Sequence, residues 1–118
     1  MSQLVLVAED DFDLRRLLTR VLLAHGYNVA TATNGREAWD QLERVQPTML
    51  VSDVTMPERT GLDVLEQLRN AGSRLPVVLI TGYAAGVEAA GTRHGAVVLA
   101  KPFTAPELLD AMARAFAR

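Results

Sequence analysis

The sequence predicts an α/β domain, in which a five-stranded parallel sheet has helices on both faces. Five short apolar runs alternate with five stretches whose apolar residues recur at helical spacing. Such an alternation requires right-handed β-α-β crossovers, which make the sheet parallel and cover both of its faces. The 118 residues are the size of one domain, and no linker, internal repeat or low-complexity segment divides them. We therefore expect a single domain over residues 1–118.

The predicted strands are short runs rich in Val, Leu and Ile, which is typical of strands buried within a parallel sheet. They cover Gln3–Ala8, Tyr27–Ala32, Thr48–Ser52, Pro76–Ile80 and Val97–Ala100. Pro57 excludes a long continuation of the third run as a central strand, because proline cannot donate to the hydrogen-bond ladder. Each of the five runs is followed directly by a polar or charged residue.

The predicted helices lie between and after these runs. Their apolar positions fall between residues 14 and 22, 38 and 45, 62 and 68, 84 and 93, and 108 and 116. Thr104 with Glu107 predicts a capping box at the last helix, and Asn34 with Glu37 has the same spacing at the second. Two glycines, each costing about 1 kcal/mol relative to Ala, predict that the helix over residues 84–93 is the least stable.

The composition excludes several classes of protein. The net charge of -2 gives no reason to expect a nucleic acid or an anionic membrane surface as partner. Because the chain has no cysteine, disulfides, zinc-thiolate centres and thiol catalysis are excluded. No apolar run approaches the ~18 residues of a membrane span, and the N-terminus lacks the pattern of a secretion signal. We expect a soluble, cytoplasmic protein.

Three residues that attract attention have ordinary structural interpretations. His25 and His94 each precede a glycine at a predicted helix end, where a histidine complements the helix dipole, so we do not interpret them as metal ligands. Trp39 lies at the margin of an apolar helix stripe and is interpreted as part of the core.

The more informative residues follow the predicted strands, at the edge where open α/β sheets bind their ligands. The first run is followed by Glu9 and Asp10, the third by Asp53, the fourth by Thr81 and the fifth by Lys101. Each alone has an ordinary explanation, as an acidic helix start, a turn aspartate or a surface lysine. Their shared position at the carboxyl ends of successive strands predicts a common site.

The residue types at this edge point to phosphoryl chemistry. Three neighbouring carboxylates repel one another, so one of them is protonated or a cation is bound. Oxygen ligands without His or Cys favour a hard ion, of which Mg²⁺ is the abundant one. An aspartate beside Mg²⁺ can attack a phosphoryl group and form an acyl phosphate. Lys101 would then pair with the phosphoryl oxygens, and the Thr81 hydroxyl would hydrogen-bond to them.

These motifs resemble the receiver domain of two-component response regulators, the CheY-like family. The resemblance covers essentially the whole chain and is carried by Glu9-Asp10, Asp53-x-x-Met56-Pro57 with Gly61, Thr81-Gly82 and Lys101-Pro102-Phe103. It implies a flavodoxin-like fold with strand order 2-1-3-4-5. It also implies a cis peptide bond before Pro102.

The resemblance assigns a role to each site residue. Asp53 would be the phosphoacceptor, Thr81 the switch hydroxyl and Lys101 the lysine that meets the phosphoryl group. The implied Mg²⁺ site comprises Glu9, Asp10, Asp53 and the Thr55 backbone carbonyl, with Glu9 acting through a metal-bound water. The chain would catalyse only its own phosphorylation and dephosphorylation, and is in that sense not an enzyme.

The resemblance also implies partners. The phosphoryl donor would be a phosphohistidine on a helical bundle, in a histidine kinase or a histidine phosphotransfer protein, and the downstream target is unknown. The docking surface would combine Arg15, Arg16 and Arg20 with Phe12 and Phe103. The alternative interpretation of the three arginines is an ordinary solvated helix face. We expect a monomer or a weak dimer.

Two departures from the family pattern bear on the mechanism. Glu9 stands where the family more often has Asp, and its longer side chain can still reach a metal-bound water. Val98 stands three residues before Lys101, where receivers often have an aromatic residue that turns inward when the threonine moves. We therefore expect Thr81 to act through the loop over residues 82–86 and the glycine-weakened helix that follows.

Two other functions are considered. A Mg²⁺-dependent phosphohydrolase with an aspartyl-phosphate intermediate would usually carry a second Asp two residues after Asp53, but that position is Thr55. A degenerate receiver that serves only as a docking module is disfavoured, because competent residues fill all the site positions.

Overall fold

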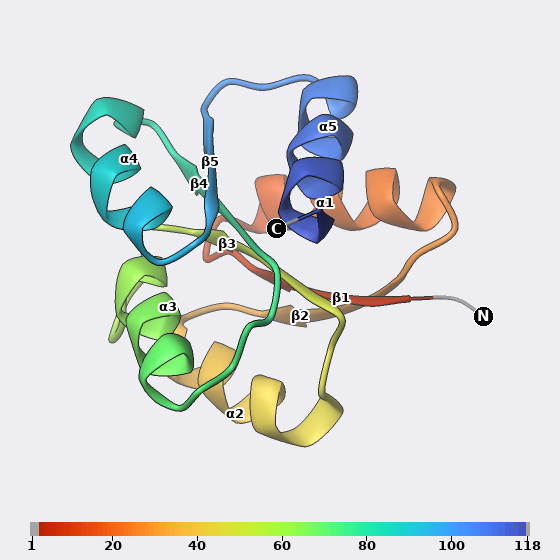
Figure 1. Cartoon of the computed structure of the whole chain (residues 1–118). Helices are drawn as coiled ribbons and strands as arrows, with labels where there is room; N and C mark the ends of the chain where they lie inside the picture. Colours follow the sequence, from red (N-terminus) through yellow and green to blue (C-terminus); the bar gives the residue numbers. More distant parts are fainter. Residues whose placement is uncertain (1–2, 118) are drawn as a thin grey trace.

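Five parallel strands form one sheet in the order β2-β1-β3-β4-β5 (Figure 1). The computed structural model describes residues 3–117. The strands are β1 (Leu4–Ala8), β2 (Asn28–Ala32), β3 (Met49–Asp53), β4 (Val77–Thr81) and β5 (Val97–Ala100). All four neighbouring pairs are parallel. The predicted fold class and the strand order implied by the resemblance are both confirmed.

Five helices cover the two faces of the sheet (Figure 1). They are α1 (Phe12–Ala24), α2 (Gly35–Val45), α3 (Gly61–Asn70), α4 (Ala84–Arg93) and α5 (Ala105–Phe116). One core cluster joins α1 and α5 to one face of the sheet, and the other joins α2, α3 and α4 to the opposite face. Alternate residues of β1 enter the two clusters, because successive side chains of a strand point to opposite faces. None of the described helices is long and apolar enough to cross a membrane.

The helix starts follow the capping rules, with one correction. Thr104 and Glu107 form the predicted capping box of α5. At α2 the Asn34 side chain accepts the Glu37 N–H at 2.8 Å, but the Glu37 carboxylate accepts the N–H of Thr33. The Asn34–Glu37 spacing therefore gives the predicted Asn34 cap but only half of a capping box, since the Glu37 carboxylate reaches one residue further back. An unpredicted capping box, formed by Thr60 and Asp63, begins α3.

The glycines of α4 have packing roles that helix propensity does not reveal. Gly91 is buried against β5, and a Cβ atom there would lie 2.8 Å from Cγ2 of Val98. A Cβ atom at Gly86 would instead overlap the exposed ring of Tyr83, which is free to move aside. Gly91 therefore lets α4 approach β5 closely, and the size of Val98 sets the limit of that approach.

We expect Gly91→Ala to lower the free energy of unfolding by about 1 kcal/mol, because overpacking against the stiff Val98 outweighs the gain in helix propensity. In a Val98→Ala background the same change should raise stability, because the obstructing methyl group is gone. Urea unfolding of the four variants measures this coupling. Gly86→Ala is the matched control and should be neutral or stabilising. A destabilisation by Gly91→Ala that persists in the Val98→Ala background would contradict the packing argument.

Candidate functional site

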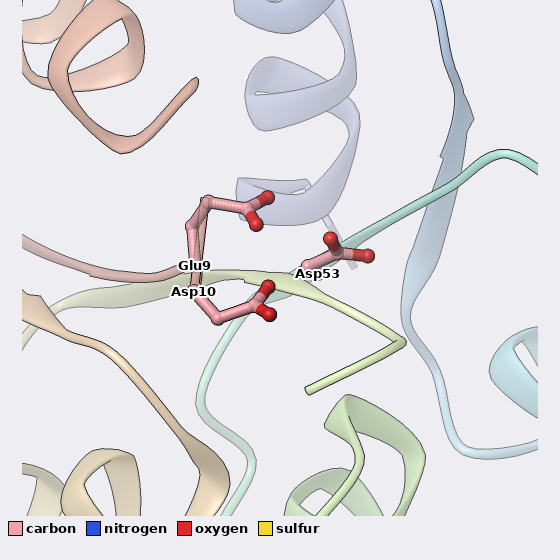
Figure 2. A group of neighbouring side chains, drawn as sticks. All are labelled: Glu9, Asp10 and Asp53. Atoms are coloured by element: carbon pink, nitrogen blue, oxygen red, sulfur yellow. The ribbon is translucent and has the colours of Figure 1, made fainter. Parts of the chain in front are cut away.

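Three carboxyl groups meet beyond the ends of two neighbouring strands. Glu9 and Asp10 follow β1, and Asp53 is the last residue of β3. Ala8 is in register with Ser52, so the next residue of each strand brings an acidic side chain to the same level. Figure 2 shows the three carboxyl groups extending to one side of the strand ends, and their oxygens lie within 4.8 Å of one another. The predicted convergence of Glu9, Asp10 and Asp53 is confirmed.

Glu9 is the most deeply buried of the three, with 1% of its surface exposed. Its Oε2 accepts the Asp11 N–H at 3.0 Å, whereas Oε1 is buried and has no hydrogen-bond partner among residues 3–117. Burial raises the pKa of Glu9 to about 7; the charge of Asp53 adds to the rise, and the Asp11 N–H and Lys101 oppose it. A carboxyl group in this position holds a proton that a cation can displace.

Asp53 lies at the centre of the site and is 5% exposed. Its Oδ2 accepts a hydrogen bond from the Lys101 ammonium at 2.8 Å, and its Oδ1 accepts the Thr55 N–H at 3.2 Å. Partial burial disfavours the charged form of Lys101, but the hydrogen bond and charge of Asp53 and the charge of Glu9 outweigh it and raise the pKa of Lys101. Lys101 therefore stays protonated and neutralises part of the acidic cluster.

Thr81 and Lys101 come from the next two strands. Thr81 ends β4, is 4% exposed, and accepts the Tyr83 N–H on its hydroxyl oxygen at 3.0 Å. The backbone N–H of Lys101 donates to the Thr81 carbonyl at 2.8 Å. This bond anchors the backbone that positions the Lys101 ammonium group. The peptide bond between Lys101 and Pro102 is cis, as the resemblance implied. All five predicted side chains therefore lie at one edge of the sheet.

Arg15 and Gly61 support this edge of the sheet through contacts that the sequence pattern does not reveal. Arg15 was interpreted as part of a solvated or docking face, but its Nη1 donates to the carbonyl of Glu9 at 2.8 Å and so holds the acidic loop. Its distance of six residues from Glu9 matches no helical contact pattern, so only the loop geometry reveals the bond. Gly61 belongs to the motif, and its lack of a Cβ matters because such an atom would overlap the Asp53 carbonyl.

The residues interpreted as structural lie apart from the acidic cluster. His25 follows α1, and its Nδ1 is 2.9 Å from the Val21 carbonyl. His94 follows α4, with Nε2 3.8 Å from a Glu66 carboxylate oxygen. Trp39 is partly buried against the core. These positions agree with the interpretation as helix-end and core residues.

The acidic cluster has the chemistry of a site for a hard cation. Its donors are carboxylate oxygens on Glu9, Asp10 and Asp53, the ligand type that Mg²⁺ prefers. A buried oxygen of Glu9 lacks a partner, and such groups ordinarily have one. The residues present therefore fit Mg²⁺. Coordination by the Thr55 carbonyl stays a prediction.

Comparison with known protein sequences relates this chain to response regulators. The family model for the response regulator receiver domain matches residues 5–113. Response regulator MprA of Mycobacterium tuberculosis is 42% identical over 114 residues, which are 95% of this chain and 50% of that protein. MprA of Mycolicibacterium vanbaalenii is 42% identical over 110 residues, or 92% of this chain and 48% of that protein. The chain thus spans about half the length of the curated relatives it matches.

Solved structures show the same likeness in three dimensions. The chemotaxis response regulator CheY4 of Vibrio cholerae has a TM-score of 0.88 at 28% identity, covering 98% of this chain and 99% of that one. A response regulator receiver domain protein from Clostridium thermocellum has a TM-score of 0.88 at 25% identity, covering 98% of this chain and 95% of that one. The whole fold, and not one motif, is therefore shared.

The raised pKa of Glu9 predicts a pH dependence of stability for the metal-free protein. Between 4.5, its ordinary value, and about 7, the folded state holds a proton that the unfolded state has released. The free energy of unfolding should therefore fall as pH rises through this interval. The difference between the two pKa values corresponds to a fall of about 3 kcal/mol in the free energy of unfolding. We expect a fall of about 2 kcal/mol, because water at the mouth of the site screens the charge.

The measurement is urea unfolding between these pH values in EDTA, for wild type and Glu9→Gln. As pH rises, the free energy of unfolding of wild type should fall by that amount relative to that of Glu9→Gln. Glu88→Gln removes an exposed carboxyl group and serves as the matched control. A wild-type curve parallel to that of Glu9→Gln would show that burial does not perturb this group.

Proposed function

The chain belongs to the response regulator receiver domain family of two-component systems, and on that premise we propose that Asp53 accepts a phosphoryl group from a phosphohistidine. The donor is a histidine kinase or a histidine phosphotransfer protein. The observation that carries the proposal is the setting of Asp53, nearly buried, 2.8 Å from the Lys101 ammonium and beside two more carboxyl groups. The protein is a phosphoacceptor switch of the cytoplasm, in which residues 1–118 form one receiver domain acting as a monomer or weak dimer.

The proposed cofactor is Mg²⁺. It would be held by Asp10 and Asp53 with the Thr55 backbone carbonyl, and by Glu9 through a bound water. When bound, the ion neutralises negative charge on the carboxylates and on the phosphoryl oxygens. Binding must displace the proton that Glu9 holds, because a ligating or water-bridged carboxylate is needed in its ionised form.

In the transfer step, a carboxylate oxygen of Asp53 forms a bond to phosphorus while the phosphorus–nitrogen bond of the donor histidine breaks. The departing imidazole nitrogen takes a proton from water. Lys101 already donates to Asp53 and carries its charge at the point where the phosphoryl oxygens arrive. Hydrolysis by water later returns the carboxylate and releases phosphate, so the switch resets.

The switch would begin at Thr81. Its hydroxyl oxygen accepts the Tyr83 N–H, and the phosphoryl group offers the hydroxyl a new hydrogen-bond partner. Val98 is not an aromatic residue that could follow the motion. The loop over residues 82–86 is attached directly to Thr81, and the Tyr83 ring covers Gly86 at the start of α4. We infer that the signal passes through this loop into α4.

A surface beside the site suits a helical donor. Leu14 and Leu17 of α1 line a largely apolar groove of about 440 Å³ with Lys101, Pro102 and Phe103. Phe12 and Leu17 are exposed, and the Arg15 guanidinium lies 5.5 Å from the centroid of the Phe12 ring. Exposed apolar side chains bordering Lys101 would let a partner bury them while its phosphohistidine reaches Asp53.

The two other functions receive less support. A phosphohydrolase would need a general acid two residues after Asp53, and Thr55 there uses its N–H to hold the Asp53 carboxylate. A docking module that is never phosphorylated would not need Lys101 within 2.8 Å of a buried aspartate.

The first test is intact mass after incubation with acetyl phosphate and Mg²⁺. Wild type should gain one phosphoryl group, and the gain should be absent in EDTA and in Asp53→Asn. Lys101→Gln should slow the reaction about 100-fold, the effect of removing one charge-stabilising donor. Asp13→Asn, which removes an exposed acid of α1, should react like wild type. A wild type that neither gains mass nor binds beryllofluoride would favour the docking module.

The proposed signal path is tested by NMR relaxation dispersion with and without beryllofluoride. The amides of residues 82–86 and of α4 should change their exchange behaviour when the phosphoryl mimic binds. In Thr81→Val, which has no hydroxyl group, this response should be largely lost while the mimic still binds at Asp53. An unchanged α4 in wild type, or an undiminished response in Thr81→Val, would refute this path.

A further inference from the structure

A second charged site lies at the opposite end of the sheet from Asp53. A pocket of about 590 Å³ opens between the segments that precede β4 and β5. Its charged and titratable lining consists of Arg69, Arg74, Arg93 and His94, and its lining includes no Asp or Glu. The acidic site faces the carboxyl ends of the strands, so this basic pocket is separate from it.

Arg69 forms the fixed wall of the pocket. Its Nε donates to the His94 carbonyl at 2.6 Å and its Nη1 to the Ser73 carbonyl at 3.1 Å. These two bonds join the segment after α3 to the segment after α4. Burial lowers the pKa of Arg69, and no carboxylate offsets that effect. The guanidinium group is therefore pre-organised, charged and only partly hydrated.

The ordinary explanation for basic residues at helix ends covers only part of this cluster. Arg69 and Arg93 lie in the last turns of α3 and α4, where a positive charge complements the helix dipole. Arg74 lies in the loop beyond α3, where that explanation does not apply. Within the described residues, none of the three has a carboxylate within 4.0 Å, whereas Arg36 and Arg114 are both paired.

We propose that this pocket binds a small phosphate-bearing molecule. A planar guanidinium group can donate two parallel hydrogen bonds to the oxygens of one phosphate group. Three arginine side chains line this pocket, and no acidic side chain does. The volume is that of an ordinary ligand site. Pro76 and Ala115 add apolar wall, which suits an uncharged portion of the ligand. The pocket shares no lining residue with the acidic site around Asp53 and would give the domain a second input.

The proposal is tested by titrating the full chain, labelled with ¹⁵N, with ADP and separately with pyrophosphate. Both titrations contain EDTA, so that the ligands are not carried to the acidic site by a metal ion. We expect saturable shifts of the Gly72, Ser73 and Gly95 amides with a Kd of about 1 mM or tighter. Equal affinity for the two probes would show that the pocket recognises the phosphate groups alone. Tighter binding of ADP would show that the apolar residues of the pocket also contribute to binding.

The decisive variant is Arg74→Gln with Arg93→Gln, because both side chains are exposed and the variant leaves intact Arg69, which joins the two segments. It should weaken binding about tenfold or more. Arg36→Gln with Arg44→Gln removes the same charge from α2 and should bind like wild type, which excludes a general charge effect. The absence of saturable shifts up to about 10 mM ligand, or equal weakening in both double variants, would overturn the proposal.

Discussion

The ion pair between Lys101 and Asp53 is the interaction on which the acidic site depends. Two carboxyl groups of the cluster are almost fully buried, and burial of an unpaired carboxylate is costly. The ammonium group lies 2.8 Å from Asp53 and 3.7 Å from Glu9, so it opposes the charge of both. Lys101 does not offset the burial of Glu9, which keeps the pKa of that carboxyl group raised to about 7. A cation at this position would favour the ionised form of Glu9.

The ion pair in turn depends on the register of the parallel sheet. Asp53 is level with Ile80, and Thr81 is level with Ala100. From β3 to β5, each strand therefore presents its polar residue one step beyond that of its neighbour. Lys101 follows β5, two strands away from Asp53, and its long side chain reaches back so that the ammonium group lies 2.8 Å from the Asp53 carboxylate. A shift of one residue in any pair would turn a site residue to the other face of the sheet.

The sequence was enough to predict the architecture and the members of the site, since both follow from positions along the chain. Strand runs ending in polar residues require only that parallel strands align at their carboxyl ends. What could not be predicted depends on distances between segments far apart. The bond from Arg15 to the Glu9 carbonyl, the approach of Gly91 to Val98 and the return bond of Glu37 to Thr33 are set by packing and loop geometry. The bond from Arg69 to the His94 carbonyl, which lies 25 residues further along the chain, depends on packing in the same way.

The helix ends show where the fold is free to move. The side chains of Asp11, Asn34, Thr60 and Thr104 cap α1, α2, α3 and α5. Helix α4 has Tyr83 at its N-cap position, with no side-chain cap hydrogen bond and no acidic residue in its first turn, so its N-terminus is held more weakly than the other four. That weak end is joined through two residues to Thr81. Its far end contributes Arg93 to the basic pocket. Because α4 connects the two sites, a ligand in the pocket that fixes α4 would alter the response to phosphorylation, and by reciprocity phosphorylation would alter the affinity of the pocket.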